Sequence, residues 1–155
     1  MNGRSFPALL AALILLVLLS PATGSSAERS DPATQSCDSR AGAFLAGRLE
    51  VWQQRLKLDG WKISVFLSDP STLKPDTLGN IHWDADKKTA VIRVLDAEHY
   101  TLACPEALND MEFTIVHELI HLELSSLPRS QASRRDEEHA VNQIADALLK
   151  LDRQK

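Results

Sequence analysis

The feature that most constrains this chain is the run His117-Glu118-Leu119-Ile120-His121, which lies in the most apolar stretch after the N-terminal region. In an α-helix, residues i and i+4 share a face with Cβ atoms about 5–6 Å apart. Two imidazoles at that spacing can bind one metal ion at roughly 2.0–2.1 Å. Glu118 lies one step round the helix, where its carboxylate can reach a metal-bound water instead of the metal.

The alternative interpretation is a pair of histidines on the polar side of a core helix, with Glu118 as an ordinary surface charge. The apolar flanks argue against it, because buried histidines and a buried glutamate are costly unless they are paired or metal-bound. The pattern therefore predicts a helix with two zinc ligands, His117 and His121, and a general base, Glu118.

A catalytic zinc site needs a third protein ligand. Our first choice is Glu138, which lies 17 residues after His121 and opens the last predicted helix; Glu137 is the second choice and His139 the third. Asn142 shares a helix face with Glu138, and we expect its side chain to hydrogen-bond a ligating histidine. The alternative is that these acidic residues only complement the positive end of the helix dipole.

The N-terminal region is typical of a secretory signal. Arg4 precedes a short apolar run over 8–19, and small residues follow, so we predict a signal peptide over 1–24. The alternative is an uncleaved anchor, but the run is short of the about 20 residues needed to span a bilayer. Residues 25–38 are predicted to be a disordered lead-in, rich in small and polar residues. A single domain is predicted over 39–155.

The chain contains two cysteines, Cys37 and Cys104. For an exported protein, which we expect to be periplasmic or secreted, they predict one disulfide. The alternative is a cysteine zinc ligand, although the sequence has no C-x-x-C spacing. The net charge of −4 gives no indication of nucleic-acid binding, and we expect no stable membrane insertion after signal cleavage.

Hydrophobic periodicity predicts an α+β domain: an N-terminal helix, a small, mainly antiparallel three-stranded sheet, and two C-terminal helices. The expected order is a helix over 39–57, strands over 61–67, 79–83 and 89–95, the metal-binding helix ending near 125 or 126, and a last helix over 133–151. The metal-binding helix has two possible starts: a capping box formed by Asn109 and Glu112, or Pro105, which suits a first helical turn.

Four segments together resemble the gluzincin metallopeptidases, and most closely the compact minimal gluzincins. They are W-K-I-x-V at 61–65, T-A-V-I-R-V at 89–94, V-H-E-L-I-H-L at 116–122 and E-E-x-x-V-N-x-I-A at 137–145. The resemblance covers about Trp52 to Leu149. The third of these motifs is specific, whereas each strand motif is weak by itself. Many of these proteins are cytoplasmic, so a signal peptide is a departure from the group.

The resemblance implies a zinc peptidase in which an extended peptide is added to an edge strand beside the metal-binding helix. The matching segment is Thr89 to Leu95, so Ala90 and Ile92 are the expected substrate contacts. Binding through main-chain hydrogen bonds would give little sequence selectivity. We identify no protein partner other than such a peptide or protein substrate.

The expected mechanism is hydrolysis by a zinc-activated water. Glu118 takes the proton of the water and passes it to the leaving amine. The developing oxyanion needs a donor, for which His82 and Tyr100 are our first choices, with Trp83 and His99 as further candidates. Two other functions stay open: a zinc-dependent amidase acting on a non-peptide or cell-wall substrate, and a non-catalytic binding module stabilised by zinc.

Overall fold

The structure is a computed structural model that describes residues 36–128 and 130–154. The predicted signal peptide and most of the predicted lead-in lie outside the described residues. In the part that is described, no helix is both long enough and apolar enough to cross a membrane.

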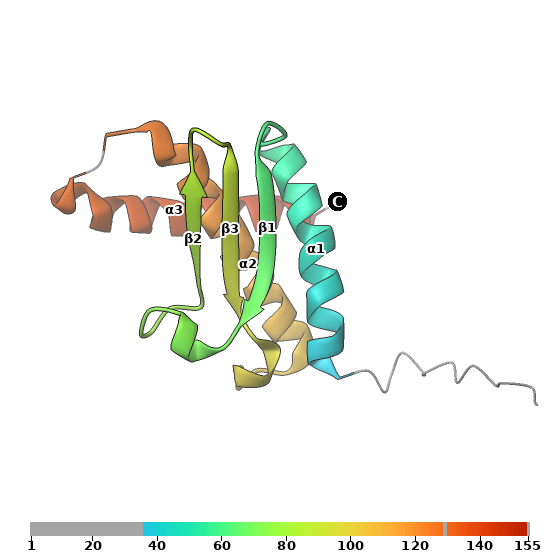
Figure 1. The fold of residues 1–155 in the computed structure, drawn as a ribbon. Helices are drawn as coiled ribbons and strands as arrows, with labels where there is room; N and C mark the ends of the chain where they lie inside the picture. Colours follow the sequence, from blue (N-terminus) through green and yellow to red (C-terminus); the bar gives the residue numbers. More distant parts are fainter. Residues whose placement is uncertain (1–35, 129, 155) are drawn as a thin grey trace, which may run out of the picture. The chain divides into compact units, whose positions relative to one another are not determined.

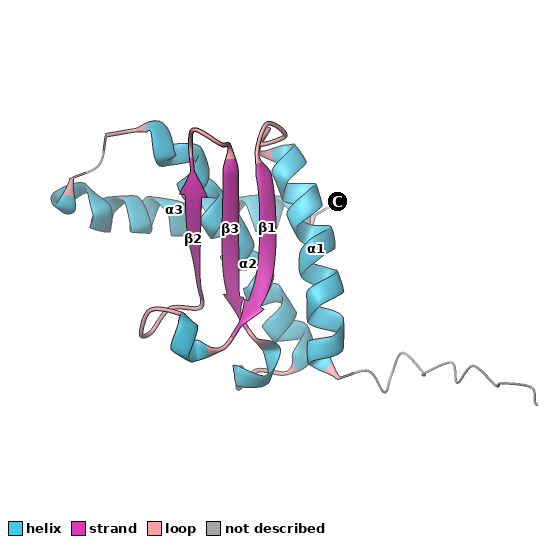
Figure 2. Cartoon of the chain, viewed as in Figure 1, coloured by secondary structure: helices cyan, strands magenta, loops and turns pink. Residues whose placement is uncertain are grey.

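The described residues form three α-helices, three strands and three short 3₁₀ turns, which confirms the predicted small α+β fold (Figures 1 and 2). In chain order the helices and strands are α1 (Cys37–Arg55), β1 (Lys62–Ser68), β2 (Gly79–Asp84), β3 (Thr89–Leu95), α2 (Cys104–Glu123) and α3 (Gln131–Asp152). The 3₁₀ turns are Pro70–Thr72, Ala97–His99 and Leu124–Ser126.

The three strands form a mixed sheet in the order β1-β3-β2. β3 pairs antiparallel with β2, so the predicted hairpin between β2 and β3 is present. It pairs parallel with β1, so the sheet has one pair of each kind where a mainly antiparallel sheet was predicted. In Figure 1, α2 and α3 lie behind the sheet and α1 runs along the β1 side. α2 contacts both β2 and β3, which places the predicted metal-binding helix against the hairpin.

The strand order corrects the expected substrate contacts. The segment Thr89–Leu95 is β3, the central strand, whose main chain pairs with a neighbour on each side. Ala90 and Ile92 are core residues with 3% and 0% of their surface exposed, so a peptide cannot reach them. Their side chains are buried because they pack in the hydrophobic core of the domain. The edge strand that contacts α2 is β2.

The helices pack through apolar faces and one buried polar network. Leu45, Leu49 and Trp52 of α1 recur at helical spacing and are buried. The indole Nε1 of Trp52 donates a hydrogen bond of 2.7 Å to Glu112 Oε1 on α2. Arg48 bonds the same carboxylate and also Asp152 of α3, at 2.7 Å. This network connects α1 to α2 and α3, the two helices that carry the site.

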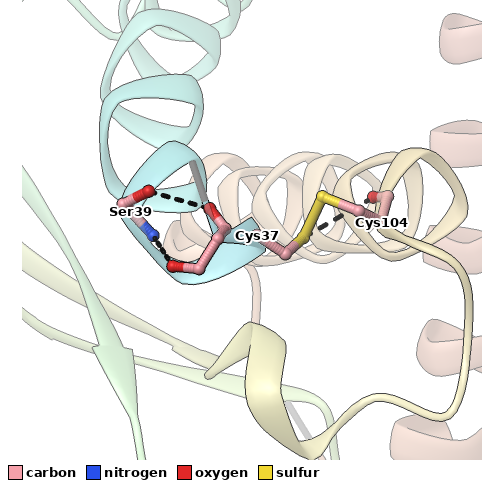
Figure 3. The surroundings of a disulfide bond; sticks show 4 residues. Cys37, Ser39 and Cys104 are labelled. Carbon is pink, nitrogen blue, oxygen red and sulfur yellow. Dashed lines mark hydrogen bonds between the residues drawn. A yellow bond between two sulfur atoms is a disulfide. The ribbon is translucent and has the colours of Figure 1, made fainter. Parts of the chain in front are cut away.

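α2 begins at Cys104 with Pro105 in its first turn, which is the earlier of the two predicted starts. Asn109 therefore lies inside the helix and does not cap it. The predicted disulfide is present and joins Cys37 to Cys104, the first residues of α1 and α2 (Figure 3). It connects positions 67 apart in the sequence.

α1 starts at Cys37, inside the predicted lead-in of 25–38, so positions 37 and 38 are helical and not disordered. The cause is local capping. The side chain of Ser36 accepts a hydrogen bond from the backbone N–H of Ser39, which satisfies one of the donors left free at a helix start. Figure 3 shows this cap beside the disulfide.

Candidate metal centre

α2 presents His117 and His121 on one face, as their spacing predicts. Their Nε2 atoms lie 3.0 Å apart and their ring centroids 4.7 Å apart. The surrounding helix is apolar, with Val116, Leu119 and Ile120 all buried. The two imidazoles therefore meet at the side of α2 that faces α3 and β2.

Glu138 of α3 lies next to both imidazoles. Its Oε2 atom is 3.4 Å from His117 Nε2 and 3.3 Å from His121 Nε2. The corners of a tetrahedral zinc site with bonds of 2.0–2.1 Å are about 3.3 Å apart, so the three atoms are spaced as such ligands would be. Among the described residues, these three side chains form the group that could hold a metal ion.

The other two candidates for the third ligand are not part of this group. His139 is exposed and its Nε2 is 3.0 Å from the side-chain amide of Gln143. Glu137 contacts the site from behind, with Oε1 3.0 Å from His121 Nδ1. This contact was not predicted, because Glu137 was considered only as the second choice of metal ligand. The signal was available, since a carboxylate behind a ligating histidine is a frequent arrangement.

Asn142 occupies the place that was predicted for it, with Oδ1 3.0 Å from His117 Nδ1. An amide oxygen and a carboxylate are both acceptors, so each Nδ1 carries the proton and donates. His117 and His121 are then in the tautomer that leaves Nε2 with a free lone pair. Both lone pairs are on the Nε2 atoms that lie next to Glu138. A neutral imidazole with a free lone pair is the protonation state that a metal ligand needs.

Burial and the neighbouring histidine act in the same direction on His117. The pKa of its imidazole is lowered, first by desolvation and then by the charge of His121, although Glu138 and Asn142 oppose the shift. A lowered pKa favours the neutral ring at neutral pH. The neutral ring is the form that binds a metal.

Glu118 is buried beside the metal group and is not part of it. Only 8% of its surface is exposed, and this burial raises the pKa of its carboxyl to about 7. Smaller effects come from His121 and Lys74, which lower the pKa, and from Glu138, which raises it. A carboxyl with such a pKa can both accept and release a proton near neutral pH.

The metal group opens into a cavity of about 510 Å³. Its walls come from the loop before β2, from β2 itself, and from α2 and α3. Besides the metal group, Glu118, Glu137 and Asn142, the lining comprises Lys74, Asp76, Thr77, Leu78, Gly79, Asn80, Ile81, Trp83, Phe113, Thr114 and Arg134. The cavity is thus an open cleft between the edge strand and two helices.

Of the four predicted oxyanion donors, the structure places only Trp83 at the cavity. His82 is exposed and lies between Ile81 and Trp83 on β2; since both neighbours line the cavity, its side chain points to the other face of the sheet. His99 lies beside Asp69 and Glu98. These positions correct the choice of His82 and His99 as donors.

Tyr100 is also outside the cavity lining, which corrects the other first choice of donor. It is packed beside Asp110 and Thr114 of α2. Burial, followed by the charge of Asp110, raises the pKa of its phenol. The phenol therefore stays protonated, but it has no access to the cleft.

Gly79 begins β2 at the point where the strand crosses α2. A Cβ atom at this position would lie 2.4 Å from Thr114 Cγ2, 2.7 Å from the backbone oxygen of Arg93 and 3.7 Å from Glu118 Oε1. The first two separations are too short for any side chain. Only glycine allows the edge strand to approach Glu118 this closely, a role that the sequence did not reveal.

No known family, curated protein or solved structure matches the chain. The likeness to gluzincins stays a prediction carried by the four sequence segments.

Proposed function

We propose that this protein is an exported zinc-dependent peptidase of the gluzincin type, with Glu118 as its general base. The observation that supports it best is the pairing of two features on one cleft. One is a three-ligand group of His117, His121 and Glu138, whose atoms are spaced for a tetrahedral metal. The other is a buried carboxylate that stays outside this group.

Zinc is the metal that a site with two histidines and one glutamate most often binds. Bound there, it would supply Lewis acidity to a carbonyl oxygen and lower the pKa of a coordinated water. Asn142 and Glu137 hold the two imidazoles in the tautomer and orientation that ligation requires. A binding module stabilised by zinc would need these contacts too, but it would have no use for Glu118.

Glu118 performs the proton transfers. Its carboxylate takes a proton from the attacking water as the carbon–oxygen bond forms, and it delivers that proton to the nitrogen as the carbon–nitrogen bond breaks. In the metal-free protein, burial brings the pKa of this carboxyl to about 7, so the group can exchange a proton near neutral pH. The burial that raises the pKa of Glu118 also strengthens the electrostatic interactions of its carboxylate.

The edge strand supports a peptide as the substrate. The N–H of Leu95 donates to the carbonyl of Leu78 at 2.8 Å, so pairs with β3 are hydrogen-bonded at every second residue from 78 onward. Gly79 and Ile81 fall between these pairs, and their N–H and C=O groups point away from β3. An extended peptide could pair with them by strand addition.

Export is proposed from the signal-like N-terminus together with the disulfide. Disulfides persist in oxidising compartments and are rare in the cytosol. The bond between Cys37 and Cys104 lies outside the metal group, so its contribution is to the stability of the domain.

The decisive experiment combines zinc content with hydrolysis of a mixed peptide library by the purified protein. We expect the wild type to bind about one zinc per chain and to cleave peptides. Glu118→Gln should keep the zinc and lose cleavage, whereas Glu138→Ala should lose both. Glu106→Gln, an exposed residue on the same helix, is the matched control and should change neither.

Two outcomes would contradict the proposal. If the wild type holds no zinc, the three-ligand group is not a metal site under those conditions. If it holds zinc but Glu118→Gln cleaves peptides at the wild-type rate, the carboxylate is not the base. Cleavage of non-peptide amides alone would favour the amidase alternative.

A further inference from the structure

A positively charged side chain, Arg134, lines the same cleft as the metal group. It belongs to α3 and lies four residues before Glu138, so the two side chains share one face of the helix. The next residue, Arg135, is also exposed but is not part of the cavity lining. Two adjacent arginines therefore differ in whether they face the cleft.

Helix stability does not explain Arg134. The N-terminal end of a helix favours negative charges and disfavours cations, yet the first turn of α3 contains no acidic residue and is followed directly by Arg134 and Arg135. An arginine that precedes a glutamate by four residues is also the less favourable order for a helical ion pair. The carboxylate of Glu138 is turned to the two histidines instead.

The charge of Arg134 is left available by its surroundings. Within residues 36–128 and 130–154, no carboxylate forms an ion pair with it. The acidic residues three and four positions further along α3 are engaged: Glu137 contacts His121, and Glu138 contacts both histidines. Besides the metal group, Glu118, Glu137 and Arg134 itself, the charged lining residues are Lys74 and Asp76, which have opposite signs and belong to the loop before β2.

We propose that Arg134 binds a carboxylate of the substrate, and that the enzyme therefore prefers peptides with a carboxylate close to the scissile bond. A guanidinium presents paired N–H donors that match the two oxygens of a carboxylate. The carboxylate can come from an Asp or Glu side chain or from a free C-terminus. This inference rests on the proposed function and names the substrate class of the same site.

The test uses a peptide that the wild type cleaves, made in matched forms. One pair has Glu or Gln beside the scissile bond, and a second pair has a free or an amidated C-terminus. We expect the form with the carboxylate to have a kcat/KM at least about fivefold higher, since hydrogen bonds to charged groups contribute more than neutral ones. The pair that shows the difference identifies the source of the carboxylate.

Arg134→Gln should bring the ratio of the two forms close to one, and Arg134→Lys should restore part of it. Arg135→Gln is the matched control and should retain the wild-type ratio. Because Arg134 is exposed, the preference should also weaken as ionic strength rises from 0.05 to about 0.5 M. A purely structural role for Arg134 would not change a ratio between two substrates.

Binding keeps the inference testable if no peptide is cleaved. The same fluorescently labelled peptides are titrated into zinc-loaded Glu118→Gln, with and without Arg134→Gln. A carboxylate preference that disappears with Arg134 supports the inference even where turnover fails, and the failure then falls on the proposed function alone. Equal treatment of both peptide forms by the wild type, or equal loss in the Arg134 and Arg135 variants, overturns the inference.

Discussion

The carboxylate of Glu137 lies 3.0 Å from Nδ1 of His121, on the opposite side of the ring from the nitrogen that meets His117 and Glu138. Two adjacent residues of α3 therefore contact different nitrogens of the same imidazole. Glu138 lies where a metal ligand would lie, and Glu137 holds the ring. The different exposures agree with this division, since the side chain of Glu137 is 16% exposed and that of Glu138 is 56% exposed.

Removing the charge of Glu137 should weaken the metal site without abolishing it. Loss of the partner behind a ligating histidine typically lowers metal affinity about 10–100-fold. We expect a decrease of that size in Glu137→Gln, measured by competition with a zinc chelator. His139→Gln, which changes an exposed neighbour, should bind zinc like the wild type. If Glu137→Gln loses zinc as completely as Glu138→Ala, Glu137 is itself a ligand and not only a support for His121.

Glu118→Gln should stabilise the metal-free protein at high pH. The pKa of Glu118 is raised from 4.5 to about 7, so folding favours the protonated form. The contribution of Glu118 to the free energy of unfolding is fully present below pH 4.5 and is lost progressively as the pH rises to about 7. The shift corresponds to at most roughly 3 kcal/mol, and the cleft-facing position reduces it. Denaturation in the presence of a metal chelator should show that Glu118→Gln raises the free energy of unfolding by about 1–2 kcal/mol at pH 8.

The control for that prediction is the same measurement at pH 4. There the carboxyl of Glu118 is protonated in the folded and in much of the unfolded protein, so the variant and the wild type should have similar free energies of unfolding. A gain of equal size at both pH values would mean that the amide packs better, and that the buried charge is not the cause.

Gly79→Ala should destabilise the protein. The added methyl group would meet Thr114 Cγ2 at 2.4 Å and the backbone oxygen of Arg93 at 2.7 Å. Overpacking of this kind costs about 1–3 kcal/mol. Gly47→Ala is the matched control, because a Cβ at that exposed helical position meets nothing within 4 Å. It should stabilise α1 by about 0.5–1 kcal/mol.

Urea denaturation of both glycine variants decides this prediction. Thr114→Ser should relieve one of the two contacts in Gly79→Ala and recover only part of the loss, because the backbone of Arg93 cannot be trimmed. Equal stability of Gly79→Ala and the wild type would show that β2 can move away from α2 at little cost.

Loss of the disulfide should lower stability by about 2–4 kcal/mol, since the bond closes a long loop and restricts the unfolded chain. We expect Cys37→Ser with Cys104→Ser to unfold at lower urea than the wild type, and a reductant to shift the wild type in the same direction. Zinc content below the transition should be unchanged, because the bond lies outside the metal group. Loss of zinc from the folded variant would connect the disulfide to the site.

Local features were predictable because they depend on the helical period. The separation of His117 and His121 by four residues places both rings on one face wherever the helix packs. Glu138 and Asn142 share a face of α3 for the same reason, so the prediction that Asn142 would contact a ligating histidine needed only the assumption that α3 returns along α2. That contact, 3.0 Å to His117, is confirmed.

Features that depend on pairing between distant segments were not predictable. The alternation in Thr89–Leu95 indicates a strand with one buried face, but it does not reveal how many neighbours the strand has. Both the edge and the central position satisfy the pattern, and the prediction of an edge strand was wrong. The same limit applies to His82 and Trp83, since period 2 separates them without showing which of them faces α2.

The amino-acid sequence by itself determined the pair of histidines on one helix face, the carboxylate between them, the disulfide partners and the α+β class, because each follows from local spacing or from composition. Only the tertiary structure decided that β2 is the edge strand at the cleft, that Glu137 holds His121, and that Arg134 faces the cavity while Arg135 does not. These depend on how α3 is rotated and where the strands are inserted, which the packing of distant side chains sets and no local pattern encodes.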